Sequence, residues 1–122
     1  MKQPSTFLVI LLLSVTVKAQ QTTQKDIHTP DTTKKIMVVE TACGECRFGL
    51  QGKSCDLAIR MNGKAYFVDG TNIDDHGDAH AKDGFCNAVR KAEVQGELVN
   101  GRFQATYFHL LPNTAKNSKR KK

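Results

Sequence analysis

Two Asn-Gly dipeptides, each between stretches of alternating apolar and polar residues, constrain the fold of this chain most strongly. Asn62-Gly63 separates the runs 57–61 and 64–68, and Asn100-Gly101 separates 93–98 from 103–107. Both residues of a two-residue hairpin turn need a positive φ angle, which asparagine and glycine adopt at low cost. The sequence therefore predicts two β-hairpins.

One further strand and one short helix complete the predicted fold. Ile36–Glu40 is a β-branched run typical of a strand, and the glycines within 43–55 indicate a structured loop. Between the hairpins, Asp83 is the predicted N-cap of a helix over 84–92, where apolar residues recur with helical spacing. This order predicts a β-rich α+β fold: a small five-stranded antiparallel OB-like barrel, or an open sheet, with one short helix between strands 3 and 4.

The ends of the chain predict export of a single small domain. A basic start, an apolar run and a small-residue end at Ala19 are typical of a secretory signal peptide over 1–19. Residues 20–35 are then a disordered leader, 36–112 one globular domain and 113–122 a basic disordered tail. After cleavage near Ala19 the protein would be periplasmic or secreted, and we expect no transmembrane segment in the mature chain.

Basic residues are concentrated outside the predicted domain. The chain has a formal charge of +6, but residues 36–112 contain eight Lys and Arg against ten Asp and Glu, while the tail contains five basic residues. A domain that binds nucleic acid should have its basic residues on the folded surface. The charge distribution argues against nucleic acid as a partner, and we expect a monomer whose partner the sequence does not identify.

Two pairs of residues are of metal-ligand type. Cys43 and Cys46 form a Cys-x-x-Cys pair, in which two thiolates in a tight turn can bind one ion. His76 and His80 are four residues apart, so on a helical turn both rings would lie on one face. Together they predict a site for Zn²⁺ or copper. The alternative ligands are Cys55 and Cys86.

Two other uses of the cysteines stay open. Small exported domains gain stability from cross-links, and Cys43, Cys46, Cys55 and Cys86 can form two disulfides in three ways, which would give a disulfide-stabilised binding module of unknown ligand. A third interpretation is a thiol-disulfide redox protein, but the glycines near Cys43 favour a loop where a thioredoxin-like pair would begin a helix. The sequence contains no nucleophile-elbow, zinc-protease or phosphate-loop motif, so it favours a non-enzymatic domain without catalytic residues.

Four segments carry a resemblance to one family. They lie within 43–49, 52–58, 63–70 and 76–88, and include a Cys-Gly-x-Cys loop and a His-Gly-Asp-Ala-His segment followed by Asp-Gly-Phe-Cys-Asn. Through them, the region from about Val38 to Pro112 resembles a family of small exported bacterial proteins classed as a domain of unknown function. The resemblance implies bacterial export and one compact domain. It implies no activity, ligand or catalytic residue.

Overall fold

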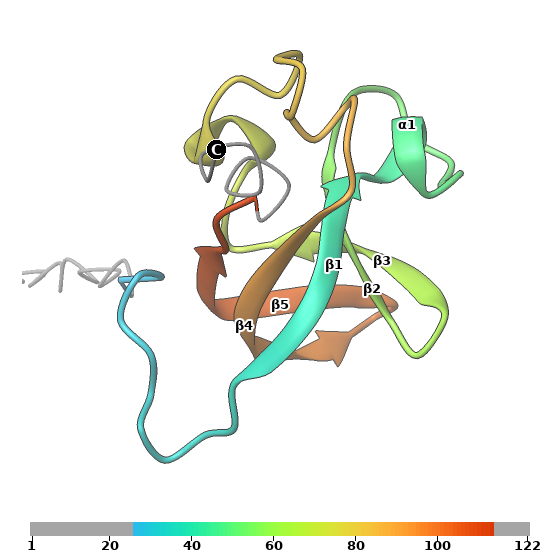
Figure 1. The fold of residues 1–122 in the computed structure, drawn as a ribbon. Helices are drawn as coiled ribbons and strands as arrows, with labels where there is room; N and C mark the ends of the chain where they lie inside the picture. The colour runs from blue at the N-terminus through green and yellow to red at the C-terminus, as the bar shows by residue number, and fades with distance from the viewer. Residues whose placement is uncertain (1–25, 114–122) are drawn as a thin grey trace, which may run out of the picture.

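The computed structural model describes residues 26–113, in which five strands form a closed barrel (Figure 1). The order around the barrel is β1-β2-β3-β5-β4, and β4 pairs with β1 to close it. The closed barrel confirms the β-rich class and shows that the open-sheet alternative was wrong. The strands are β1 (Met37–Cys43), β2 (Leu57–Met61), β3 (Lys64–Asp69), β4 (Arg90–Val99) and β5 (Arg102–Leu110).

Both predicted hairpins are confirmed. At the first turn φ is 50° for Asn62 and 80° for Gly63, and at the second it is 51° for Asn100 and 75° for Gly101. The flanking strands pair antiparallel directly from the turn residues outward, as β2 with β3 and β4 with β5. The two Asn-Gly dipeptides that predicted the hairpins thus adopt the positive φ angles that these turns require.

The prediction of a wholly antiparallel barrel was wrong. β3 and β5 run parallel, with Val68 opposite Phe103 and Asp69 opposite Gln104. The reason is topological, because strands in a closed ring can alternate in direction throughout only when their number is even. A closed barrel of five strands must therefore contain a parallel pair.

The helix predicted over 84–92 was also wrong. Residues 77–89 form turns and irregular structure, and the last three residues of the segment belong to β4, where Ala92 pairs with Val39 of β1. Pairing with β1 overrides the helical spacing of the apolar residues, since a strand ladder buries Ala92 completely. Short helices occur elsewhere: α1 (Gly44–Arg47) lies between β1 and β2, and the 3₁₀ helix η1 (Ile73–His76) lies between β3 and β4.

The segment over 26–35 is tied to the barrel through Ile27, Asp31 and Lys34. The N–H of Phe108 donates to the carbonyl of Ile27 at 3.0 Å, and the side chain of Ile27 packs on the core. The Gln95 side chain, 1% exposed, donates to the carbonyls of Asp31 and Lys34 and accepts the N–H of Asp31, each at 2.8 Å. These residues fall within the predicted leader, whereas the predicted signal peptide and all but one residue of the tail lie outside the described residues.

No helix within residues 26–113 is long and apolar enough to cross a membrane.

Candidate metal centre

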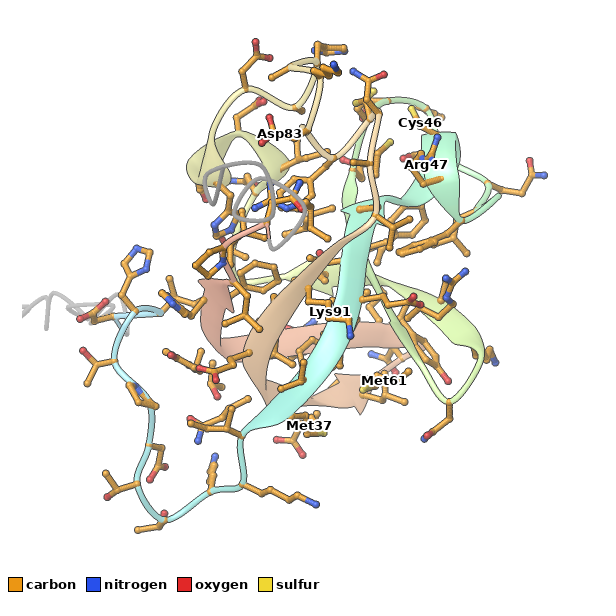
Figure 2. All side chains as sticks on the ribbon, in the orientation of Figure 1. Met37, Cys46, Arg47, Met61, Asp83 and Lys91 are labelled. Atoms are coloured by element: carbon orange, nitrogen blue, oxygen red, sulfur yellow. The ribbon has the colours of Figure 1, made fainter. Side chains whose placement is uncertain are left out.

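Four cysteines meet at one end of the barrel. The sulfurs of Cys43, Cys46, Cys55 and Cys86, named here the sulfur cluster, all lie within 4.8 Å of one another. Figure 2 shows Cys46 on α1 at the same end as the loop with Asp83, whereas Met37 lies at the far end of β1. The cluster therefore joins the loops that extend beyond this end of the strands.

Cys43 ends β1 and caps α1. It is fully buried, and its sulfur accepts the N–H of Cys46 at 3.3 Å. An N-cap side chain normally accepts such a bond through oxygen, and here the sulfur takes that role. Residues 44–47 are thus one helical turn rather than the predicted loop, because the Cys43 side chain satisfies a free N–H at the helix start.

Reciprocal hydrogen bonds bring Cys55 to this turn. The N–H of Gly44 donates to the carbonyl of Asp56 at 2.8 Å, and the N–H of Asp56 donates to Oε2 of Glu45 at 3.0 Å. With its chain neighbour held in this way, the sulfur of Cys55 lies 3.8 Å from that of Cys46. The sequence pattern did not mark Glu45, since an acidic residue on a short turn has no distinctive signature.

Cys86 reaches the cluster on the loop over 77–89. The N–H of Cys43 donates to the carbonyl of Phe85 at 3.0 Å, and the N–H of Cys86 donates to the carbonyl of Ala79 at 2.9 Å. Phe85 is 3% exposed and anchors the loop in the core. A Cβ at Gly84 would overlap the carbonyl oxygen of Ala79, so the close return of this loop requires glycine there.

Crowding of the sulfurs disfavours the thiolate form of Cys46 and Cys86 in the absence of a cation. The neighbouring Cys43 thiol, followed by partial desolvation and Cys55, raises the pKa of the Cys46 thiol well above its usual range. Desolvation, followed by contact with Cys55, raises the pKa of Cys86 to about 11. A cation reverses this balance, because a metal-bound thiol is deprotonated. Cys46 and Cys86 are therefore suited to the thiolate form when a positive ion is present.

The two histidines of the predicted site lie outside the sulfur cluster. The half-buried ring of His76 packs on that of Phe108 at 4.5 Å between centroids, and its Nε2 lies 2.9 Å from Oγ1 of Thr71. Burial lowers the pKa of His76. His80 is exposed and lies beyond Gly77, whose φ of 104° ends η1, so the two rings do not share a helical face.

The structure thus brings together the cysteine half of the predicted ligand set. Cys43 and Cys46 are joined by Cys55 and Cys86, which the sequence indicated as alternative ligands. All four cysteines are free thiols, and the 3.8 Å between the sulfurs of Cys46 and Cys55 compares with about 2.05 Å in a disulfide.

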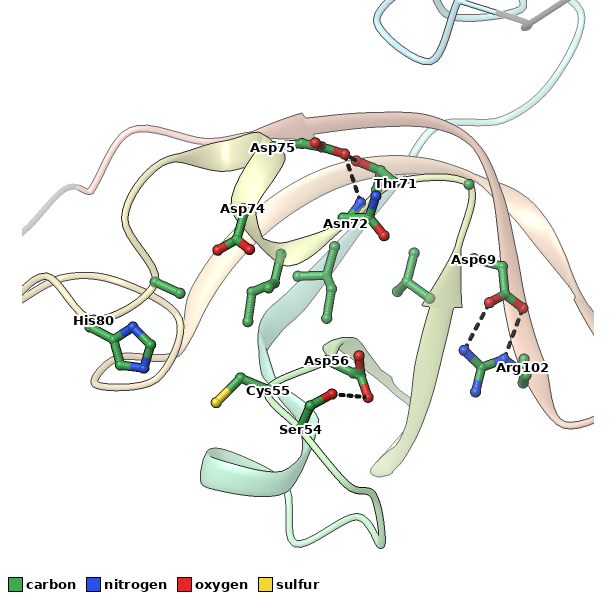
Figure 3. A pocket seen from close by; sticks show the side chains of 15 residues that line it. Ser54, Cys55, Asp56, Asp69, Thr71, Asn72, Asp74, Asp75, His80 and Arg102 are labelled. Atoms are coloured by element: carbon green, nitrogen blue, oxygen red, sulfur yellow. Dashed lines mark hydrogen bonds and ion pairs between the residues drawn. The ribbon is translucent and has the colours of Figure 1, made fainter.

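A cavity of about 640 Å³ adjoins the cluster (Figure 3). Cys55 and His80 both line it, and in this view the Cys55 sulfur points toward the side on which His80 lies. At the other side, Arg102 donates to both carboxylate oxygens of Asp69, at 2.9 and 2.8 Å, and holds the pKa of Asp69 below its usual value. Sequence reasoning did not identify this cavity, because its walls come from segments far apart in the chain.

Residues 37–111 match a family of unknown function, DUF6370. The chain belongs to this family. The match confirms the resemblance to a domain of unknown function, and the matched range of the DUF6370 domain includes the whole sulfur cluster and both predicted histidine ligands. Searches of curated proteins and of solved structures gave no match. The function of this DUF6370 domain is therefore argued from its site.

Proposed function

We propose that this protein is an exported, non-enzymatic metal-binding domain whose sulfur cluster binds one Zn²⁺ or Cu⁺ ion. The mutual distances of the sulfurs carry the proposal. In a tetrahedral site with Zn–S bonds of about 2.3 Å, neighbouring sulfurs are about 3.8 Å apart. The sulfurs of Cys46 and Cys55 have a separation of 3.8 Å, and the other pairs lie within 4.8 Å, so small side-chain rotations suffice to close the site.

The donor set supports a thiophilic ion. Thiolates prefer Zn²⁺ and Cu⁺ over the hard ions Mg²⁺ and Ca²⁺, and four sulfurs in a tetrahedron favour zinc among these. With four protein ligands, such an ion has no open position for a water or substrate molecule. The proposed site is therefore one that stores, carries or uses an ion structurally rather than one that catalyses a reaction.

An ion in the cluster would tie three segments together. It would join the end of β1 with α1, the segment before β2 and the loop before β4. A closed five-stranded barrel of the OB-like type supplies the scaffold, and a core this small gains stability when a metal cross-links its loops. The signal-peptide pattern of residues 1–19 supports export. Export would place this domain in an oxidising compartment, where a bound metal also protects the thiolates from oxidation.

Elemental analysis of protein purified anaerobically from the exported fraction tests the proposal. We expect one Zn²⁺ or Cu⁺ per chain, no thiol reactive toward a disulfide reagent while the ion is bound, and four reactive thiols after chelation and denaturation. Cys55→Ser should lower the ion content, whereas Ser54→Ala, a change at the adjacent residue, should leave it unchanged. Wild-type protein without bound metal and with all thiols oxidised would refute the proposal.

The adjacency of Cys46 and Cys55 also supports a second candidate function, a disulfide-stapled module that binds an unidentified ligand in the cavity. A bridge between these two sulfurs, 3.8 Å apart, would leave Cys43 to pair with Cys86, to whose loop it is hydrogen-bonded. Intact mass under non-reducing conditions separates the two functions. Two disulfides lower the mass by about 4 Da relative to the reduced chain and leave no thiol to bind an ion.

A further inference from the structure

The four sulfurs differ in how an ion could reach them. Cys43 is fully buried, whereas Cys46 is exposed on α1 and Cys55 lines the cavity. Arg47 follows the exposed Cys46 and Glu45 precedes it, so the charges next to that sulfur offset each other. The cavity at Cys55 is the concave approach to the cluster, and its charge decides whether it attracts an ion.

The charge of the cavity favours cations. Its walls contain four aspartates and one arginine, a formal charge of −3 with His80 neutral. Arg102 is paired with Asp69 and is also attracted electrostatically by Asp56, while Asp74 and Asp75 line the cavity without a basic partner in its walls. A concave surface with charges of one sign raises the local concentration of the opposite ion.

His80 is held at this cavity through its backbone. Its N–H donates to Oδ1 of Asp78 at 2.9 Å, and its carbonyl accepts the side-chain amide of Asn87 at 2.9 Å, which ties it to the residue after Cys86. Within residues 26–113 the exposed ring makes no hydrogen bond, and His80 is not one of the four residues whose ligand atoms cluster. The imidazole thus shares the cavity with Cys55 and is available to a ligand.

We propose that this cavity is the face through which the ion is exchanged, with His80 as a transient ligand. The proposal rests on metal binding by the sulfur cluster. During release an imidazole nitrogen of His80 would bond to the ion as its bond to the Cys55 sulfur breaks. An acceptor with nitrogen or sulfur donors would then replace His80 and the remaining three cysteines at the ion, and each freed thiolate would take a proton from solvent. Loading follows the same steps in reverse, and no electron is transferred.

The rates of Zn²⁺ exchange in His80→Ala test this proposal. Release to an excess of a chromogenic chelator and loading from free Zn²⁺ are followed by stopped flow, and affinity is measured by competition at equilibrium. We expect both rates to fall by about tenfold, which corresponds to about 1.4 kcal/mol in the barrier to exchange, while affinity and stoichiometry stay unchanged. Both rates should fall by the same factor, because His80 would lower the barrier between the ion-bound and ion-free states without changing the free energy of either state. His109→Ala, a change at an exposed histidine on β5 outside the cavity, should leave both rates unchanged.

Three results would overturn the proposal. Exchange rates in His80→Ala equal to those of the wild type, with the ion bound, would refute the route and leave metal binding by the cysteines intact. A lower affinity, or a changed absorption spectrum of the Co²⁺-substituted protein, would show His80 to be a resident ligand rather than a transient one. A wild-type protein that binds neither Zn²⁺ nor Co²⁺ would refute the proposed function itself.

Discussion

Gly44 is a position where one added methyl group should directly disturb the sulfur cluster. This buried glycine is the first residue of α1, between the two cysteines of the Cys-x-x-Cys pair. A Cβ there would lie 2.6 Å from Cε1 of Phe67 and 3.1 Å from both Cβ of Ala58 and Cδ1 of Leu50. We therefore expect Gly44→Ala to push α1, and Cys46 with it, away from β2 and β3.

The size of the effect follows from two opposing contributions. Forcing an extra methyl group into a packed site costs about 1–3 kcal/mol. Replacing glycine by alanine in a helix returns up to about 1 kcal/mol of backbone entropy. The overlap is the larger contribution because three neighbours are affected at once, so the free energy of unfolding should fall by about 1–2 kcal/mol. Zn²⁺ affinity should fall as well, since α1 positions Cys46.

Urea unfolding of the reduced, metal-free protein measures the first effect, and chelator competition measures the second. Phe67→Leu removes the ring atom nearest to the new methyl group, so the double variant should regain much of the lost stability. We expect a coupling energy of at least about 1 kcal/mol in the double-mutant cycle. Phe48→Leu is the matched control, because the Phe48 ring contacts Arg60 and is not among the atoms nearest to Gly44.

Two outcomes would refute this reasoning. A Gly44→Ala variant as stable as the wild type would show that the neighbours move aside without cost. A destabilised variant that is rescued equally by Phe67→Leu and Phe48→Leu would show that the contact with Phe67 is not its cause.

Three further substitutions test other parts of the fold. Gln95→Leu removes three part-buried hydrogen bonds to Asp31 and Lys34, each with a net worth of about 1 kcal/mol, so we expect a loss of up to about 3 kcal/mol and faster amide hydrogen exchange over 26–35. Unchanged exchange there would contradict the role of Gln95 in holding this segment. Gly96→Ala places a Cβ onto the backbone carbonyl oxygen of Gln104, so thermal unfolding should show a loss of more than about 3 kcal/mol, and a wild-type melting temperature would be inconsistent with this contact. Because burial lowers the pKa of His76, the unfolded chain binds a proton at this residue more tightly than the folded protein does. The contribution of His76 to the free energy of unfolding is complete above about pH 6.5 and is lost as the pH falls below that value. The urea midpoint should therefore fall more between pH 7 and pH 5 in the wild type than in His76→Gln, and equal falls would count against the burial argument.

The features predicted correctly depend on interactions between residues close together in the chain. Each Asn-Gly turn specifies its own hairpin, since the φ angles that it needs are a property of those two residues. The Cys-x-x-Cys pair is similar, because one turn is enough to bring Cys43 and Cys46 together. The predicted helix over 84–92 failed for the opposite reason. Ala92 has the spacing of a helical stripe, but pairing with Val39, a residue far away in the chain, makes it part of a strand.

The sequence by itself determined the two hairpins, the closeness of Cys43 and Cys46 and the membership of a β-rich class. Only the tertiary structure decided which residues complete the candidate site. Cys55 is placed by the bond from Gly44 to the carbonyl of Asp56, and Cys86 is placed by the bond from Cys43 to the carbonyl of Phe85. The first bond continues the pairing of β1 with β2, and the second joins the end of β1 to the loop before β4, so both need segments that are distant in the chain to come together. Tertiary packing also leaves His80 at the cavity that Cys55 lines.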